Sequence, residues 1–273
     1  MKRHKICKII FAILAVFLCV VFYELIGICI TYKKQPAVSD ATIKETQNIM
    51  SVVGKENTER AVIIEKNSQA LLERVRLIQN AKDEIILSTF AFKSDESGKL
   101  ILGALHDAAD RGVHVRILVD GMESWIDMEG NPYFYGLSSH ENVEIKLYNK
   151  ANPLKPWKTM GRMHDKYLIA DGKIYILGGR NTYNYFLGDF PGHKNFDRDV
   201  LVVCDEPQKD NSVNQLWNYF ETIWEQEDCR YFHNSKKLAD RQSVKKAVLE
   251  LQEGYQQYFE VNTVSYTHLR AHE

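Results

Sequence analysis

The sequence of 273 residues has few cysteines, no C-x-x-C pair and no low-complexity segment. Cys7, Cys19 and Cys29 lie in or beside an apolar N-terminal stretch, whereas Cys204 and Cys229 lie far from it. Without paired cysteines, a cysteine-based metal cluster is not indicated. Cys204 and Cys229 can form a disulfide in an oxidising compartment, but two buried free thiols are the preferred interpretation.

The chain also lacks a strong excess of charge, with a formal net charge of −1 and a pI near 6.8. Residues 1–34 carry six basic residues and one acidic residue, so the remaining residues have a net charge of about −6. A mildly acidic remainder argues against binding of duplex DNA, which requires a basic face, and no nucleic acid partner is expected. The hydrophobic fraction of 45% excludes disorder as the main description.

Long apolar runs are absent except for one, residues 9–31, which contains a single charged residue, Glu24. A helix needs roughly 20 residues to cross the hydrocarbon core, and no A-x-A-like cleavage site follows the run. Residues 1–34 are therefore predicted to be an uncleaved membrane anchor; a cleaved signal peptide and a buried core helix are the alternatives. Basic residues before the run outnumber those after it, which predicts a single-pass protein of the cell membrane with its soluble part outside the cytoplasm.

After a polar linker at residues 35–58, short apolar runs alternate with segments of helical periodicity. Strands are expected at residues 61–65, 84–92, 114–120, 142–148 and 199–203. Helices are expected at residues 67–82, 97–111, 212–226 and 235–259. Two β-rich runs joined by Asp171-Gly172 predict a hairpin within residues 164–178. This order indicates an α/β fold, a mixed β-sheet flanked by helices on both faces, preceded by one transmembrane helix.

The expected hairpin carries the residues with chemical potential. His164 and Lys166 are two apart in a strand, so both side chains should point to one face. The chain continues through Asp171 and the pair Gly178-Gly179 to Asn181, giving H-x-K-x4-D-x6-G-G-x-N. Lys166 and Asn181 can both donate hydrogen bonds to one phosphate, and the two glycines allow a ligand to approach the backbone closely.

This pattern resembles the signature of the phospholipase D superfamily. The resemblance extends upstream to residues 79–82, 90–92 and 119–121 and downstream to residues 197–200, and it covers residues 60–232. The segment around His164 looks most like the bacterial cardiolipin synthase-like branch. The resemblance implies an α-β-α sandwich and assigns residues 59–232 to one catalytic repeat.

The family's chemistry, as the resemblance implies it, is phosphodiester transfer through a phosphohistidine, without metal or cofactor. His164 would be one of two histidines, one attacking phosphorus and the other protonating the leaving group. Lys166 and Asn181, with the backbone at Gly178 and Gly179, would bind the phosphate oxygens.

Three carboxylates join the implied site. Asp199, or as second choice Asp197, would orient the attacking histidine. Asp171 belongs to the motif but occupies a turn, where it can hold the hairpin instead of contacting phosphate.

Synthases and lipases of this family carry two such repeats, whereas this sequence contains one. Residues 233–261 are expected to be a helical linker toward a missing second repeat, and residues 262–273 a foreign or unstructured tail. A truncated gene is the preferred explanation. The alternative is a single-repeat protein that completes its site by homodimerisation, as the family's small nucleases do.

The leading functional hypothesis is a membrane-anchored enzyme that makes cardiolipin from phosphatidylglycerol. Phospholipid hydrolysis and a homodimeric nuclease are the alternatives. Two further features stay open: Pro153–Lys158 either docks on a lipid surface, which tryptophan favours, or is a packed loop, and Arg162 and Arg180 either contact a headgroup or lie on the surface.

Overall fold

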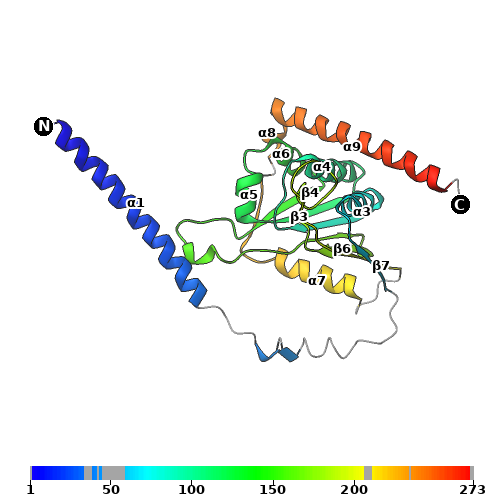
Figure 1. Cartoon of the computed structure of the whole chain (residues 1–273), viewed down its shortest axis with the longest axis horizontal. Helices are drawn as coiled ribbons and strands as arrows, with labels where there is room; N and C mark the ends of the chain where they lie inside the picture. The colour runs from blue at the N-terminus through cyan, green and yellow to red at the C-terminus, as the bar shows by residue number, and fades with distance from the viewer. Residues whose placement is uncertain are drawn as a thin grey trace. The chain divides into compact units, whose positions relative to one another are not determined.

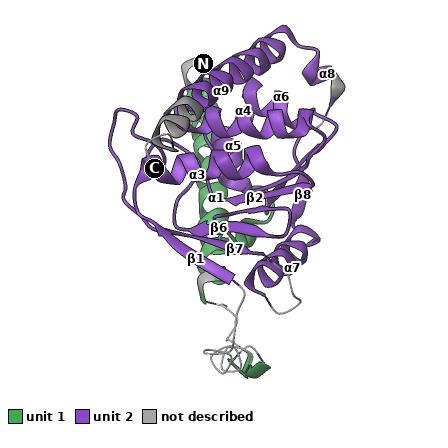
Figure 2. Ribbon diagram, turned by 90° about the vertical axis from the view of Figure 1, so that its right-hand side faces the viewer, with its two compact units in different colours: residues 1–56, 151–162 green, residues 57–150, 163–273 purple. Residues whose placement is uncertain are grey.

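The computed structural model describes residues 2–33, 39–41, 43–44, 59–205, 211–233 and 235–270. These residues form two compact units (Figure 2): residues 1–56 with 151–162, and residues 57–150 with 163–273. Most of the linker predicted at residues 35–58 lies outside the described residues.

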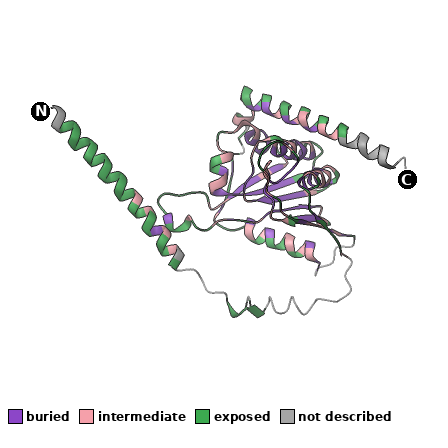
Figure 3. Ribbon diagram, in the orientation of Figure 1, coloured by how far each residue is buried: buried purple, intermediate pink, exposed green. Residues whose placement is uncertain are grey.

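The first unit contains the apolar helix α1 (Lys2–Lys33) and a short 3-10 helix, η1 (Pro156–Lys158). Within α1, Lys5–Thr31 is long and apolar enough to cross a membrane. The helix is exposed along most of its length (Figure 3). The prediction of one N-terminal apolar helix is confirmed.

The second unit is built on one mixed sheet, which lies between layers of helices (Figure 1). Its eight strands have the order β1-β7-β6-β5-β2-β3-β4-β8. Strands β2, β3 and β4 are parallel to one another, and all other neighbours are antiparallel. The strands are β1 (Glu59–Ile64), β2 (Glu84–Thr89), β3 (His114–Asp120), β4 (Val143–Tyr148), β5 (Tyr167–Ala170), β6 (Ile174–Gly178), β7 (Asp199–Cys204) and β8 (Cys229–Tyr231).

Helices cover both faces of this sheet, as predicted. The larger core cluster joins the sheet to α3, α4, α6 and α9, and the smaller one joins the opposite face to α7 through Val213, Phe220 and Trp224. The helices are α3 (Asn67–Asn80), α4 (Glu96–Asp110), α5 (Gly121–Asp127), α6 (Pro132–Ser138), α7 (Ser212–Trp224), α8 (Lys236–Ala239) and α9 (Gln242–Arg270).

The hairpin of β5 and β6 turns at Asp171 and Gly172, which both have positive φ. Two successive residues of this backbone conformation are what a tight hairpin turn requires, and Asp and Gly are among the residues that tolerate it. β5 begins at Tyr167 rather than at His164. His164 and Lys166 therefore lie in the segment that enters the strand, whereas the sequence analysis placed them within the strand.

The C-terminal helix differs from the prediction in its bounds. α9 runs to Arg270 without a break at 261, because no glycine or proline follows Gly254 to end it. Its Val244, Leu251 and Tyr255 are buried against α4 and α6, so this helix is part of the second unit. Residues 271–273 lie outside the described residues.

Candidate functional site

His164 lies at the edge of the sheet where β2, β3 and β4 end and β5 begins. Its side chain is exposed, and its ring meets the ring of Phe90 edge to face, with centroids 4.7 Å apart. Phe90 directly follows β2, whose antiparallel pairing with β5 brings the two segments together. The carboxyl edge of parallel strands is where ligand sites of α/β sheets commonly occur.

Lys166 lies beside His164 but is buried, with 6% of its surface exposed. Its Nζ donates to the His164 carbonyl oxygen at 2.6 Å and lies 5.4 Å from the centre of the Phe90 ring. Burial lowers the pKa of Lys166, and the nearby charges of Asp165 and Asp197 oppose that shift. The lysine nitrogen therefore lies against the His164 backbone and beside the Phe90 ring, which the imidazole also contacts.

Asn181 comes to the same edge from the loop after β6. Its Oδ1 accepts from the Ala91 backbone N–H at 3.2 Å, and a bridge between Phe92 and Thr182 continues this pairing. This contact fixes the amide so that its NH2 group remains the donor for a ligand. The structure thus brings His164, Lys166 and Asn181 to one edge, as the motif predicted.

Asp171 is not at this edge. Its carboxylate accepts from the backbone N–H groups of Lys82, Asp83 and Glu84 at 2.8–3.2 Å. β5 separates it from His164, and seven extended residues span about 20 Å. Asp171 holds the hairpin turn to the start of β2, the structural role considered in the sequence analysis.

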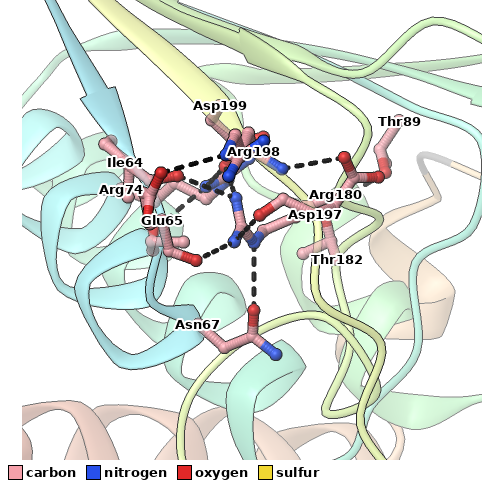
Figure 4. Close-up of polar contacts among 11 residues, drawn as sticks. Ile64, Glu65, Asn67, Arg74, Thr89, Arg180, Thr182, Asp197, Arg198 and Asp199 are labelled. Atoms are coloured by element: carbon pink, nitrogen blue, oxygen red, sulfur yellow. Dashed lines mark hydrogen bonds and ion pairs between the residues drawn. The ribbon is translucent and has the colours of Figure 1, made fainter.

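Asp199 and Arg180 form a buried ion network with Arg74 (Figure 4). Asp199 Oδ2 lies 2.9 Å from Arg74 and 3.2 Å from Arg180, and all three side chains are at least 95% buried. Within the described residues, no recorded contact joins Asp199 to His164, and Asp199 Oδ1 has no hydrogen-bond partner. Arg180 is therefore neither a surface residue nor a headgroup ligand, because its guanidinium is fully enclosed.

Arg180 also positions Asp197. Its guanidinium donates to the backbone oxygens of Asp197, Ile64 and Glu65 and to Asn67 Oδ1 (Figure 4). The half-buried Asp197 carboxylate accepts from the Arg198 N–H at 2.8 Å and is close enough to favour the charged form of Lys166. Of the two aspartates considered from sequence, Asp197 is the one whose charge reaches the site.

Gly178 and Gly179 make room for these two carboxylates. A Cβ at Gly178 would collide with Asp199, and one at Gly179 would collide with the Asp197 carboxylate. Their small size is thus explained within the protein itself, before any phosphate is considered.

Two aspartates outside the motif hold the segments that carry it. Asp120 Oδ1 caps α5 by accepting from Met122 and Glu123, while Oδ2 accepts from the Met163 N–H at 3.2 Å. Asp95 likewise caps α4 through the Gly98 N–H and accepts from the Asn184 N–H at 2.8 Å. Sequence reasoning assigned neither a role at the site; residues 119–121 entered only as part of the resemblance.

Comparisons with known proteins agree with this geometry. The family model described as cardiolipin synthase, PLD-like domain, matches residues 75–224. An uncharacterized protein of Helicobacter pylori is 33% identical over 181 residues, which are 61% of this chain and 35% of that protein. Cardiolipin synthase C of Escherichia coli is 29% identical over 154 residues, 51% of this chain and 31% of that enzyme.

The chain thus spans about a third of the length of these curated relatives. Among solved structures, NucT from Helicobacter pylori matches with a TM-score of 0.50 at 16% identity, over 64% of this chain and 99% of that one. At this identity the likeness concerns the fold alone. Because the family model covers more than half of the sequence, the chain belongs to the cardiolipin synthase-like branch of the phospholipase D superfamily.

Proposed function

We propose that this protein transfers a phosphatidyl group between phospholipids through a covalent intermediate on His164, forming cardiolipin from two phosphatidylglycerol molecules. The observation that carries the proposal is the convergence of an exposed imidazole, a buried cationic lysine and a fixed amide at one sheet edge. The similarity to cardiolipin synthases supports the choice of lipid.

The proposed reaction has two steps. The His164 imidazole attacks the phosphorus of one phosphatidylglycerol, and a second imidazole protonates the departing glycerol oxygen, so the products are phosphatidyl-histidine and glycerol. The headgroup hydroxyl of a second phosphatidylglycerol then attacks phosphorus and releases His164. Its proton passes to the second imidazole, which restores the starting state.

Lys166 and Asn181 are proposed to stabilise charge on the nonbridging oxygens during both steps. Each supplies a fixed donor, and one such donor contributes about 3–4 kcal/mol to transition-state stabilisation in comparable sites. Asp197 is proposed to favour the charged Lys166. The second imidazole would come from a second repeat or from a second copy of this chain.

α1 is proposed to anchor the protein in the cell membrane, with the N-terminus in the cytoplasm and the second unit outside it. The length and apolar composition of Lys5–Thr31 support the anchor, and the basic residues before it support the orientation. Reporter fusions at each end report the topology; a cytoplasmic C-terminal reporter would contradict this orientation.

The reaction is tested by lipid analysis of phosphatidylglycerol vesicles containing the protein. Cardiolipin and glycerol in equal amounts are expected. Phosphatidic acid and glycerol instead would identify a hydrolase, in which water replaces the lipid acceptor. No lipid product in any assembly state of the protein would contradict phospholipid chemistry altogether.

A further inference from the structure

The segment 151–162 interrupts the second unit between β4 and β5 and belongs to the first unit with α1 (Figure 2). The Tyr23 hydroxyl donates to the Leu154 carbonyl oxygen at 3.0 Å, and the Thr31 hydroxyl donates to the Trp157 carbonyl oxygen. These two contacts lie eight residues apart near the C-terminal end of α1, so the segment runs along this part of the helix.

Gly27 makes the close approach between them possible. A Cβ at this position would lie 2.6 Å from Cγ of Pro156, closer than such atoms can come. Gly27 is also the one buried residue of α1 among those whose side chains are described, so the segment covers it. Tyr23, Gly27 and Thr31 are spaced by four residues and therefore share one face of the helix.

The contact with α1 also determines which part of the apolar stretch Lys5–Thr31 residues 151–162 cover. Thr31 is the last residue of the apolar stretch Lys5–Thr31, and Tyr23 precedes it by eight residues. At 1.5 Å per residue, the segment covers about the last 12 Å of the span. A bilayer changes from headgroups to acyl chains over a distance of this order.

The side chains of the segment suit that boundary. Leu154, Trp157 and Met160 are 77%, 45% and 52% exposed. Basic residues alternate with them, at positions 155, 158 and 162. Exposed apolar side chains are unfavourable in water, whereas tryptophan and long basic side chains concentrate at membrane interfaces, the latter with their heads toward anionic lipid headgroups.

We propose that residues 151–162 are a second membrane-contacting element, seated on α1 and inserted at the headgroup–acyl boundary of an anionic phospholipid bilayer. The proposal rests on the proposed anchoring by α1. In the sequence the element ends at Arg162, two residues before His164. The stretch of chain that enters the catalytic motif is thus the one that contacts lipid.

The test is to reconstitute the full chain in nanodiscs of phosphatidylglycerol and phosphatidylethanolamine and measure quenching of Trp157 by acyl-brominated lipids. The emission of Trp157 is the difference between the wild type and Trp157→Phe. We expect it to be quenched by bromine near the headgroup more strongly than by bromine deep in the chains. The emission of Trp224, taken as the difference between the wild type and Trp224→Phe, should not be quenched by either brominated lipid, because Trp224 is 3% exposed in the core.

Anchoring and the second contact are measured separately. A chain that fails to co-elute with nanodiscs contradicts the anchor itself. A chain that co-elutes while Trp157 remains unquenched overturns the second contact and leaves the proposed catalytic function untouched, since no turnover is measured.

The packing of residues 151–162 against α1 is tested separately. Gly27→Leu should displace Pro156 and accelerate tryptic cleavage after Lys158 and Arg162 at least severalfold. Ala15→Leu adds bulk to an exposed position of α1 and should leave the cleavage rate unchanged. Equal rates in the two variants would show that the segment is not held by α1.

Discussion

At the scale of single residues, the site depends on carboxylates that each serve two segments. Asp120 and Asp95 use one oxygen to cap a helix and the other to hold a backbone N–H beside the motif. Asp120 accepts from the N–H of Met163, the residue before His164, so we propose that it positions the imidazole. Such a residue affects catalysis by holding the reacting group in place, and a displacement of that group by about 1 Å can lower the rate about 100-fold.

Asp120→Ser separates the two roles of this carboxylate. Serine still caps α5, but its short side chain cannot also reach the Met163 N–H. We expect kcat to fall about 10- to 100-fold with KM little changed. Asn131→Ser, which alters the cap of α6 without contacting the motif, should leave kcat unchanged. Equal kcat in the two variants would remove the positioning role.

The lowered pKa of Lys166 predicts the alkaline side of the activity profile. Burial disfavours the ammonium, so Lys166 loses its proton at a lower pH than an exposed lysine does. If the charged form binds phosphate, activity falls as pH rises through that pKa. Lys166→Arg retains the charge, so its residual activity should persist to higher pH; Lys173→Arg, in the hairpin turn, serves as the control. If the activity of Lys166→Arg declined at the same alkaline pH as that of the wild type, the charge of Lys166 would not be what binds phosphate.

One short motif carries His164, Lys166 and Asn181, and the structure brings all three to one sheet edge, as that motif predicted. It did not predict the ion pair of Asp199 with Arg74 or the backbone partners of Asp171, because these partners are distant in sequence. Arg74 is 125 residues from Asp199, and the N–H groups that bind Asp171 are 87–89 residues away. Spacing within a motif cannot reveal such contacts, which depend on the order of strands in the sheet.

At the scale of elements, hydrophobic periodicity predicted the strands and helices that have strong patterns. β8 was missed because three residues carry too little pattern to recognise, and its pairing with β4 comes from tertiary structure. The helix at residues 235–259 was predicted from its apolar stripe, and residues 233–261 were assigned as a linker because a second repeat was expected to follow them. The apolar stripe of α9 packs on two helices through glycines, Gly103 of α4 and Gly136 of α6. Because glycine does not contribute to a hydrophobic pattern, the sequence did not predict where α9 packs.

Gly103→Ala tests how closely α9 packs. A Cβ there would lie 2.6 Å from the Leu251 carbonyl oxygen, a backbone atom that cannot move freely. We expect the free energy of unfolding to fall by about 1–3 kcal/mol despite the better helix propensity of alanine. Gly254→Ala meets no atom within 4 Å and should raise it by up to about 1 kcal/mol. Denaturant unfolding measures both; a gain at Gly103 would contradict close packing.

At the scale of the whole molecule, the proposed chemistry needs two imidazoles, and the sequence contains one H-x-K-x4-D pattern. One histidine cannot carry the phosphatidyl group and also protonate the leaving glycerol. We therefore expect activity only in assemblies that supply a second site histidine. Activity measured against oligomeric state by light scattering tests this, and turnover by a verified monomer would contradict the two-histidine mechanism.

The central claim is that His164 carries the phosphatidyl group, and it is tested most directly by trapping the intermediate. The protein is mixed with phosphatidylglycerol, quenched within one turnover and digested, and the peptides are analysed by mass spectrometry. We predict a phosphatidyl adduct on His164 that is absent from His164→Asn and unchanged in His193→Asn, which alters an exposed loop histidine. Turnover by His164→Asn, or an adduct on another residue, would contradict the mechanism.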